Sequence, residues 1–108
     1  QGGINVICHP HIYKEDYWPF ERLMNLENYL AIEIFNNNVK MNNSGRAVAT
    51  DVWDKLLTAG KHIYGMANDD MHHFSRLGGA FIMVKSATKD KFGILSALRK
   101  GCFYSSDP

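Results

Sequence analysis

Short apolar runs alternate with polar segments along this chain, and five of the runs predict β-strands. The run 4–8 has little polar interruption, which is typical of a strand buried in a parallel sheet. The runs 29–35, 63–67 and 79–84 are similar. The last of these is apolar on both faces, so we expect a central strand there. A final short strand begins at Cys102.

Apolar residues at helical spacing predict three helices between these strands. The clearest covers residues 46–59, whose apolar residues form one stripe: Ala49, Val52, Trp53, Leu56 and Leu57. Gly60 lies where a C-terminal cap belongs. A shorter helix is expected over about 18–28, with Pro19 at its first position.

The last predicted helix is capped by Thr88 and ends at Gly101, whereas the asparagine-rich segment 36–45 predicts a polar loop. Strands and helices then follow the order β-α-β-α-β-β-α-β, which favours an α/β fold with a mostly parallel sheet. We expect residues 1–108 to form a single domain. Because the sequence starts and stops on strands, we interpret it as part of a larger barrel.

Composition and charge exclude several classes of protein. The 12 basic and 11 acidic residues leave a net charge of +1, and scattered basic residues do not suggest nucleic-acid binding. No apolar stretch approaches the roughly 20 residues of a membrane span. Cys8 and Cys102 form no CxxC motif, and we expect Cys8 to be a small buried apolar residue. A reducing, cytoplasmic setting is the default expectation.

Candidate chemistry follows two of the predicted strands. The run 63–67 leads into Asn-Asp-Asp-Met-His-His, in which Asp70 and His72 are two residues apart and point the same way if the strand continues. The first run ends in His9-Pro10-His11. Carboxylate and imidazole at the carboxyl edge of a sheet predict a divalent metal site. Glu33 and Asn36 lie at the end of the strand predicted over 29–35. Because side chains alternate along a strand, only one of the two can face the predicted metal site.

Five segments resemble the polymerase and histidinol phosphatase (PHP) superfamily, in the order found there. The segment 2–11 resembles its GG-apolar-HPH motif, 31–36 its AIEIYN strand, and 65–74 its G-A-x-D-D-x-HH segment. The segment 78–85 resembles the glycine-opened strand that follows, and 94–106 the ALRxGxFYAS ending of stand-alone phosphoesterases. The resemblance extends over nearly the whole chain.

The resemblance implies the C-terminal part of a distorted (β/α)7 TIM-like barrel that hydrolyses phosphoesters with up to three metal ions. It implies zinc, manganese or iron as cofactor, His9, Asp70 and His72 as metal ligands, and Asp70 and His72 as catalytic residues. The family's H-x-H motif, D-H motif and bridging Glu precede the His-Pro segment and have no counterpart here. We therefore expect the isolated chain to be inactive.

Two further residues are candidates for binding a phosphorylated small-molecule substrate. Arg76 follows His72 by four residues and could clamp a phosphate, although a surface ion pair is the alternative. His11 could reach substrate or face solvent. The competing hypothesis for the whole chain is a metal-binding or scaffold fragment that catalyses no reaction. In either case we expect self-association, or packing against a missing N-terminal portion of the barrel.

Overall fold

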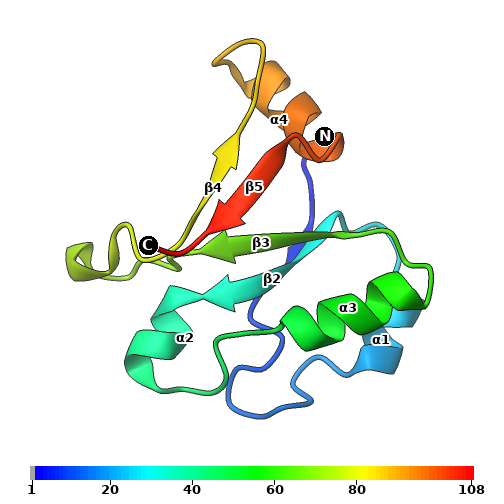
Figure 1. Cartoon of the computed structure of the whole chain (residues 1–108), viewed down its shortest axis with the longest axis vertical. Coiled ribbons are helices and arrows are strands. Elements are labelled where there is room, and N and C mark those ends of the chain that lie inside the picture. Colours follow the sequence, from blue (N-terminus) through cyan, green and yellow to red (C-terminus); the bar gives the residue numbers. More distant parts are fainter. Residues whose placement is uncertain (1) are drawn as a thin grey trace.

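The computed structural model describes residues 2–108, and its chain order runs from β1 to β5 through four helices and one 3-10 turn (Figure 1). The elements are β1 (Val6–Ile7), α1 (Phe20–Asn25), β2 (Ala31–Asn36), α2 (Asn37–Asn42), α3 (Thr50–Thr58), β3 (Tyr64–Asn68), η1 (Phe74–Arg76), β4 (Phe81–Val84), α4 (Lys91–Arg99) and β5 (Phe103–Ser106). Each predicted strand and helix is present, most of them shorter than expected. No helix in this described part is long and apolar enough to cross a membrane.

The first three strands form a parallel sheet in the order β1-β2-β3. Parallel pairing brings the carboxyl ends of the strands to one edge. Figure 1 shows that α2 and the loop containing η1 both lie beyond that end of β2 and β3. The chemistry-bearing segments that follow the strands therefore meet at one edge of the sheet, as the sequence predicts.

The register of β2 against β3 shifts once, within the strand that carries Glu33. Glu33 pairs with Met66, but Phe35, two residues later, pairs with Ala67. One residue of β2 is therefore extra, as in a β-bulge, and alternation of side chains is interrupted there. This irregularity decides which side chains of β2 face the edge.

The expectation that the chain is the C-terminal part of a distorted (β/α)7 barrel with mostly parallel strands is wrong for this structure. β4 and β5 form a separate two-stranded antiparallel sheet, and no closed barrel forms from residues 2–108. The hydroxyl of Ser105 accepts from the Ala67 backbone N–H at 3.2 Å and donates to the Gly65 carbonyl at 2.8 Å. A side chain thus occupies the edge of β3 where a further parallel strand would pair.

The prediction of β4 as a central strand is also wrong. Its residues alternate between exposed and half-buried, with Phe81 and Met83 exposed and Ile82 and Val84 turned inward. Antiparallel pairing with β5 allows one face of a sheet to remain open, whereas a buried parallel strand is covered on both faces. An apolar run alone does not distinguish the two arrangements.

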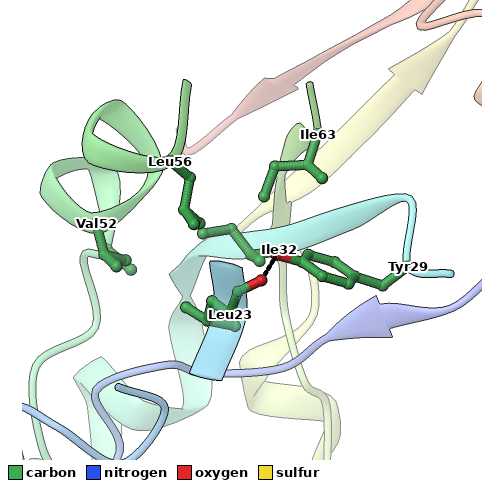
Figure 2. Close-up of a cluster of buried hydrophobic side chains, with 7 residues drawn as sticks. Leu23, Tyr29, Ile32, Val52, Leu56 and Ile63 are labelled. Atoms are coloured by element: carbon green, nitrogen blue, oxygen red, sulfur yellow. Dashed lines mark hydrogen bonds between the residues drawn. The ribbon is translucent and has the colours of Figure 1, made fainter. Parts of the chain in front are cut away.

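The main core lies between the parallel sheet and helices α1 and α3. Figure 2 shows Leu23 of α1, Ile32 of β2 and Leu56 of α3 converging, and none of the three is exposed to solvent. The Tyr29 hydroxyl, also buried, donates to the Leu23 carbonyl at 2.7 Å. The apolar stripe of α3 therefore packs as its spacing predicts.

The asparagine-rich segment differs from its prediction, because it contains α2 instead of only a loop. Asn36 caps this helix, its side-chain oxygen accepting from the Val39 N–H at 2.9 Å. Asn43 ends it in the left-handed conformation, with φ of 50°, which asparagine tolerates better than most residues. Two asparagines at the two ends thus allow a helix in a segment of low helix propensity.

Caps elsewhere also differ from expectation in small ways. Asp90, not Thr88, caps α4 by accepting from the Gly93 N–H at 2.7 Å. Pro19 lies one position before the first turn of α1 and not within it. Helix α3 begins at Thr50, later than its apolar stripe suggests.

Two neighbouring leucines of α3 provide a test of the core. Leu56→Ala should lower the free energy of unfolding by about 2–5 kcal/mol, because it leaves a cavity between α1, α3 and β2. Leu57→Ala, at a 37% exposed position, should cost roughly 0.5 kcal/mol. Urea unfolding of both variants checks this packing, and equal losses would contradict it.

Candidate functional site

The buried carboxylate of Glu33 lies at the centre of the carboxyl edge and accepts three hydrogen bonds. Its Oε2 accepts from the backbone N–H of His9 at 2.7 Å and from Asn36 Nδ2 at 3.0 Å. Its Oε1 accepts from Asn68 Nδ2 at 2.9 Å. His9 follows β1, Asn36 ends β2 and Asn68 ends β3. One carboxylate therefore ties together the ends of all three parallel strands.

Glu33 and Asn36 both face the edge, which the alternation argument does not allow. The bulge between Glu33 and Phe35 adds the residue that brings the two side chains to the same side. The Asn36 amide contacts the Glu33 carboxylate directly. The parity prediction is therefore wrong, and the extra residue in β2 is the reason.

Asp70 and His72 adjoin the same cluster, so the structure brings the two strongest sequence candidates together with Glu33 and Asn36. Asp70 Oδ2 accepts from Asn36 Nδ2 at 3.2 Å and from Asn38 Nδ2 at 3.5 Å. His72 Nδ1 lies 2.7 Å from the Asp70 carbonyl oxygen and 3.8 Å from Asp70 Oδ1. A carbonyl at that distance places the ring proton on Nδ1, because the oxygen can only accept. The lone pair of His72 Nε2 is then free to bind a metal ion.

His9 combines a strained backbone with a buried ring nitrogen that has no partner among the described residues. Its φ is 33° and that of Asp70 is 49°, a left-handed conformation that costs residues other than glycine energy. The His9 Nδ1 atom is buried and, within residues 2–108, has no hydrogen-bond partner. The ring lies 6.0 Å from that of Tyr17, centre to centre.

The donor atoms fit a divalent metal ion in kind. Carboxylate and imidazole are the ligands that zinc and manganese accept in proteins, and Asp70 and His72 supply one of each. In the described part of the chain, however, no three His, Cys, Asp or Glu side chains lie close enough together to hold an ion. A metal ion bound there would have Asp70 and His72 as protein ligands, and the role of His9 as a third ligand stays a prediction.

Cys8 is exposed, so the expectation of a buried residue is wrong. Partial desolvation of the thiol raises its pKa, and the nearby negative charges of Glu33 and Asp70 raise it further. Cys8 therefore stays a neutral thiol at physiological pH. Both Cys8 and Cys102 are free, in line with the absence of a CxxC motif.

Asp69 closes the loop that carries the candidate ligands. Its two carboxylate oxygens accept from the backbone N–H groups of Gly78 and Ala80, each at 2.8 Å. Desolvation acts to raise the pKa of Asp69, but hydrogen bonds from the N–H groups of Gly78, Ala80 and Gly79 outweigh it and lower the pKa. Asp69 therefore anchors the loop through Gly78 and Ala80. Neither of these hydrogen bonds involves His72.

Arg76 lies at the end of the same loop but not against Asp70 or His72. Its Nη2 donates to Asn42 Oδ1 at 3.0 Å, and its carbonyl accepts from Asn37 Nδ2 at 3.3 Å. The Nε atom is buried and has no partner among the described residues. The phosphate-binding prediction thus stays open, with one donor of Arg76 unsatisfied.

His11 belongs to a different cluster from the one predicted. It is buried, its Nδ1 is bonded to the Glu15 carbonyl, and its Nε2 lies 3.6 Å from Asp51 Oδ1. Arg46 bridges the carboxylates of Glu15 and Asp51, with Nη2 contacts of 2.7 and 2.9 Å. None of these contacts involves Asp70 or His72, and the ring is not solvent-facing. The structure therefore gives His11 a place in an ion-pair network between the β1–α1 loop and α3.

Three asparagines of the site are missed by sequence reasoning: Asn38, Asn42 and Asn68. Asn38 and Asn42 lie in the segment 36–45, which that reasoning assigns to a loop. The spacing of Asn38 and Asn42, four residues apart, is the one signal that could have suggested a shared helix face.

Comparison of the chain with protein-family models, with curated protein sequences and with solved structures finds no match.

The network around Arg46 predicts a specific acid sensitivity. Hydrogen bonding to Arg46 lowers the pKa of Asp51 from 3.8 to about 2. Because the folded pKa is depressed, the stabilisation is complete above pH 3.8 and is lost as the pH falls through about 2. The stability difference between the parent and Asp51→Asn should therefore shrink over that range.

The expected difference at neutral pH is no more than about 1 kcal/mol, because these side chains are largely exposed and screened. Urea unfolding of both proteins at several pH values between 5 and 2 measures it. A difference that does not change with pH would contradict the assignment.

Proposed function

We propose that the edge formed by β2 and β3 binds a divalent metal ion and that the protein is a metal-dependent phosphoesterase of PHP type. The observation that carries the proposal is the pair of Asp70 and His72, with the Nδ1 proton of His72 held by the Asp70 carbonyl. This arrangement leaves the lone pair of His72 Nε2 available on the same short loop as the Asp70 carboxylate, although the ring nitrogen near that carboxylate is Nδ1, 3.8 Å from Oδ1. A hydrogen bond from a metal-bound histidine to a carbonyl is the usual support of such sites.

A bound divalent ion would supply an activated water molecule and neutralise charge on the phosphoryl oxygens. The chain's own residues orient the ligands and bind substrate. Asn36 and Asn38 hold the Asp70 carboxylate, while Glu33 fixes the backbone of His9. The Arg76 Nε is buried and lacks a partner in the part of the chain described, so it would have to become accessible before it could donate to a phosphate oxygen.

A second function, that of a metal-binding or scaffold fragment without turnover, is favoured by one observation. Among residues 2–108 no group of three His, Cys, Asp or Glu side chains is positioned to hold an ion. With two protein ligands the affinity would be modest and the reaction centre incomplete. The phosphorylated small-molecule substrate of the first proposal would then have no role in this chain.

Single substitutions at the two ligands test the metal site. Titration of Mn²⁺ or Zn²⁺ into the purified chain should show binding that Asp70→Asn and His72→Ala each abolish, because each removes half of the protein ligands. The matched control is His73→Ala, which alters an exposed neighbouring histidine. Binding that survives both ligand substitutions would contradict the proposed site.

Hydrolysis of p-nitrophenyl phosphate by the isolated chain, which we expect to be inactive alone, would decide for the first function if it were observed. A phosphoesterase should release p-nitrophenol only when metal is present and should lose this activity in His72→Ala but not in His73→Ala. Metal binding without hydrolysis at saturating metal is expected of the isolated chain under either function. Hydrolysis that persists with a chelator present would contradict the first.

A further inference from the structure

The helix α2 presents two asparagines on one face, toward the loop that follows β3. Asn38 and Asn42 are one turn apart, and Asn42 Nδ2 donates to Asn38 Oδ1 at 3.0 Å. Asn42 Oδ1 in turn accepts from Arg76 Nη2 at 3.0 Å, and Asn38 Nδ2 donates to Asp70 Oδ2 at 3.5 Å. The side chains of Arg76, Asn42, Asn38 and Asp70 therefore form one continuous chain of hydrogen bonds, here called the amide relay.

The two ends of the amide relay fix its direction. A guanidinium group has only donors, so Asn42 must turn its oxygen toward Arg76. An ionised carboxylate has only acceptors, so Asn38 must turn its NH₂ group toward Asp70. Both amide orientations, which are otherwise interchangeable in shape, are thereby determined. Every hydrogen bond in the relay donates toward Asp70.

The reversed orientation of Asn38 would disturb the candidate ligand Asp70. Its oxygen would then face the Asp70 carboxylate, which is repulsive. The Asn38 amide nitrogen also lies 3.3 Å from His72 Nδ1, but both are donors when Nδ1 carries its proton, so this contact does not hold the ring. The orientation of Asn38 thus supports the Asp70 carboxylate, and the His72 ring is held by the Asp70 carbonyl alone.

We propose that Asn42 is a positioning residue that carries the orientation imposed by Arg76 to Asn38, and so prepares the Asp70 carboxylate, next to His72, to bind a metal ion. This inference rests on the proposed function of Asp70 and His72. It assigns Arg76 an anchoring role in addition to any contact with phosphate. Asn37 supports the anchor, because its side chain donates to the Arg76 carbonyl.

The test separates the direction of the relay from the packing of α2. Asn42→Asp keeps an acceptor for Arg76 but has no donor for Asn38. Asn42→Leu removes both functions at similar size. Met41→Asp places the same new charge on the neighbouring, exposed position of α2 and leaves the relay intact, so it controls for the attraction of a carboxylate to a cation.

Zn²⁺ titration should show up to about 10-fold weaker binding in Asn42→Asp and Asn42→Leu, the lower end of the loss caused by removing a residue in direct contact with a ligand, because Asn42 acts through Asn38. Met41→Asp should bind at least as tightly as the parent. The urea midpoint of Asn42→Asp should equal or exceed that of the parent, because its new carboxylate pairs with Arg76. Unchanged zinc affinity in Asn42→Asp would overturn the proposal, since a purely structural role would be preserved there.

A metal-free measurement keeps this proposal distinguishable from the proposed function. Exchange of the Asn38 side-chain amide protons with water, followed by NMR, should be faster in Asn42→Asp and Asn42→Leu than in the parent or Met41→Asp. Equal exchange rates in all four proteins would overturn the amide relay. A parent that binds no zinc would overturn the proposed function, while the exchange rates would still decide for or against the relay.

Discussion

The hydrogen bonding of the Glu33 carboxylate is the interaction on which the arrangement of the site depends. Glu33 is 4% exposed, and burial of an acidic group is costly unless its oxygens are hydrogen-bonded. Three donors from the ends of β1, β2 and β3 meet this requirement at once. The need to satisfy one buried side chain therefore holds the three strand ends together, and with them the segments that carry His9 and Asp70.

Asn36 extends this constraint from the sheet into the neighbouring elements. Its amide nitrogen contacts both Glu33 and Asp70, while its oxygen caps α2 through the Val39 N–H. A side chain that is 1% exposed thus links strand, helix and loop. The position of α2 relative to Asp70 follows from it, and so does the alignment of Asn38 and Asn42 with the β3–β4 loop.

The hydrophobic pattern predicts the helices α1, α3 and α4 and the strands, but it does not predict how the strands are arranged into sheets. The stripe from Ala49 to Leu57 and the apolar runs placed α3 and the parallel strands, because burial against a sheet imposes those periods. The apolar run at β4 does not show its pairing, because an apolar strand can pair in either direction. In addition, the Ser105 hydroxyl bonds to backbone groups at the free edge of β3, where another parallel strand would pair. Helix α2 could not be predicted from propensity, since its formation depends on Asn36 as a cap.

For the site, the spacing of Asp70 and His72 and their place after a strand were informative. The joint facing of Glu33 and Asn36 depends on a bulge, which alternation cannot reveal. His11 was misplaced because its direction is set by Glu15, Arg46 and Asp51, distant residues that pair with one another through charge. Local sequence thus indicates which residues are chemically suited to a site better than it indicates which of these side chains lie close together.

The most direct test of the central claim is a crystal structure of the chain grown with Zn²⁺, with the metal located by anomalous scattering. The account predicts an ion at about 2.0–2.2 Å from the Asp70 carboxylate and from His72 Nε2, with Glu33 still bonded to the His9 N–H. An edge without zinc, or zinc bound instead beside His11 and Asp51, would contradict it.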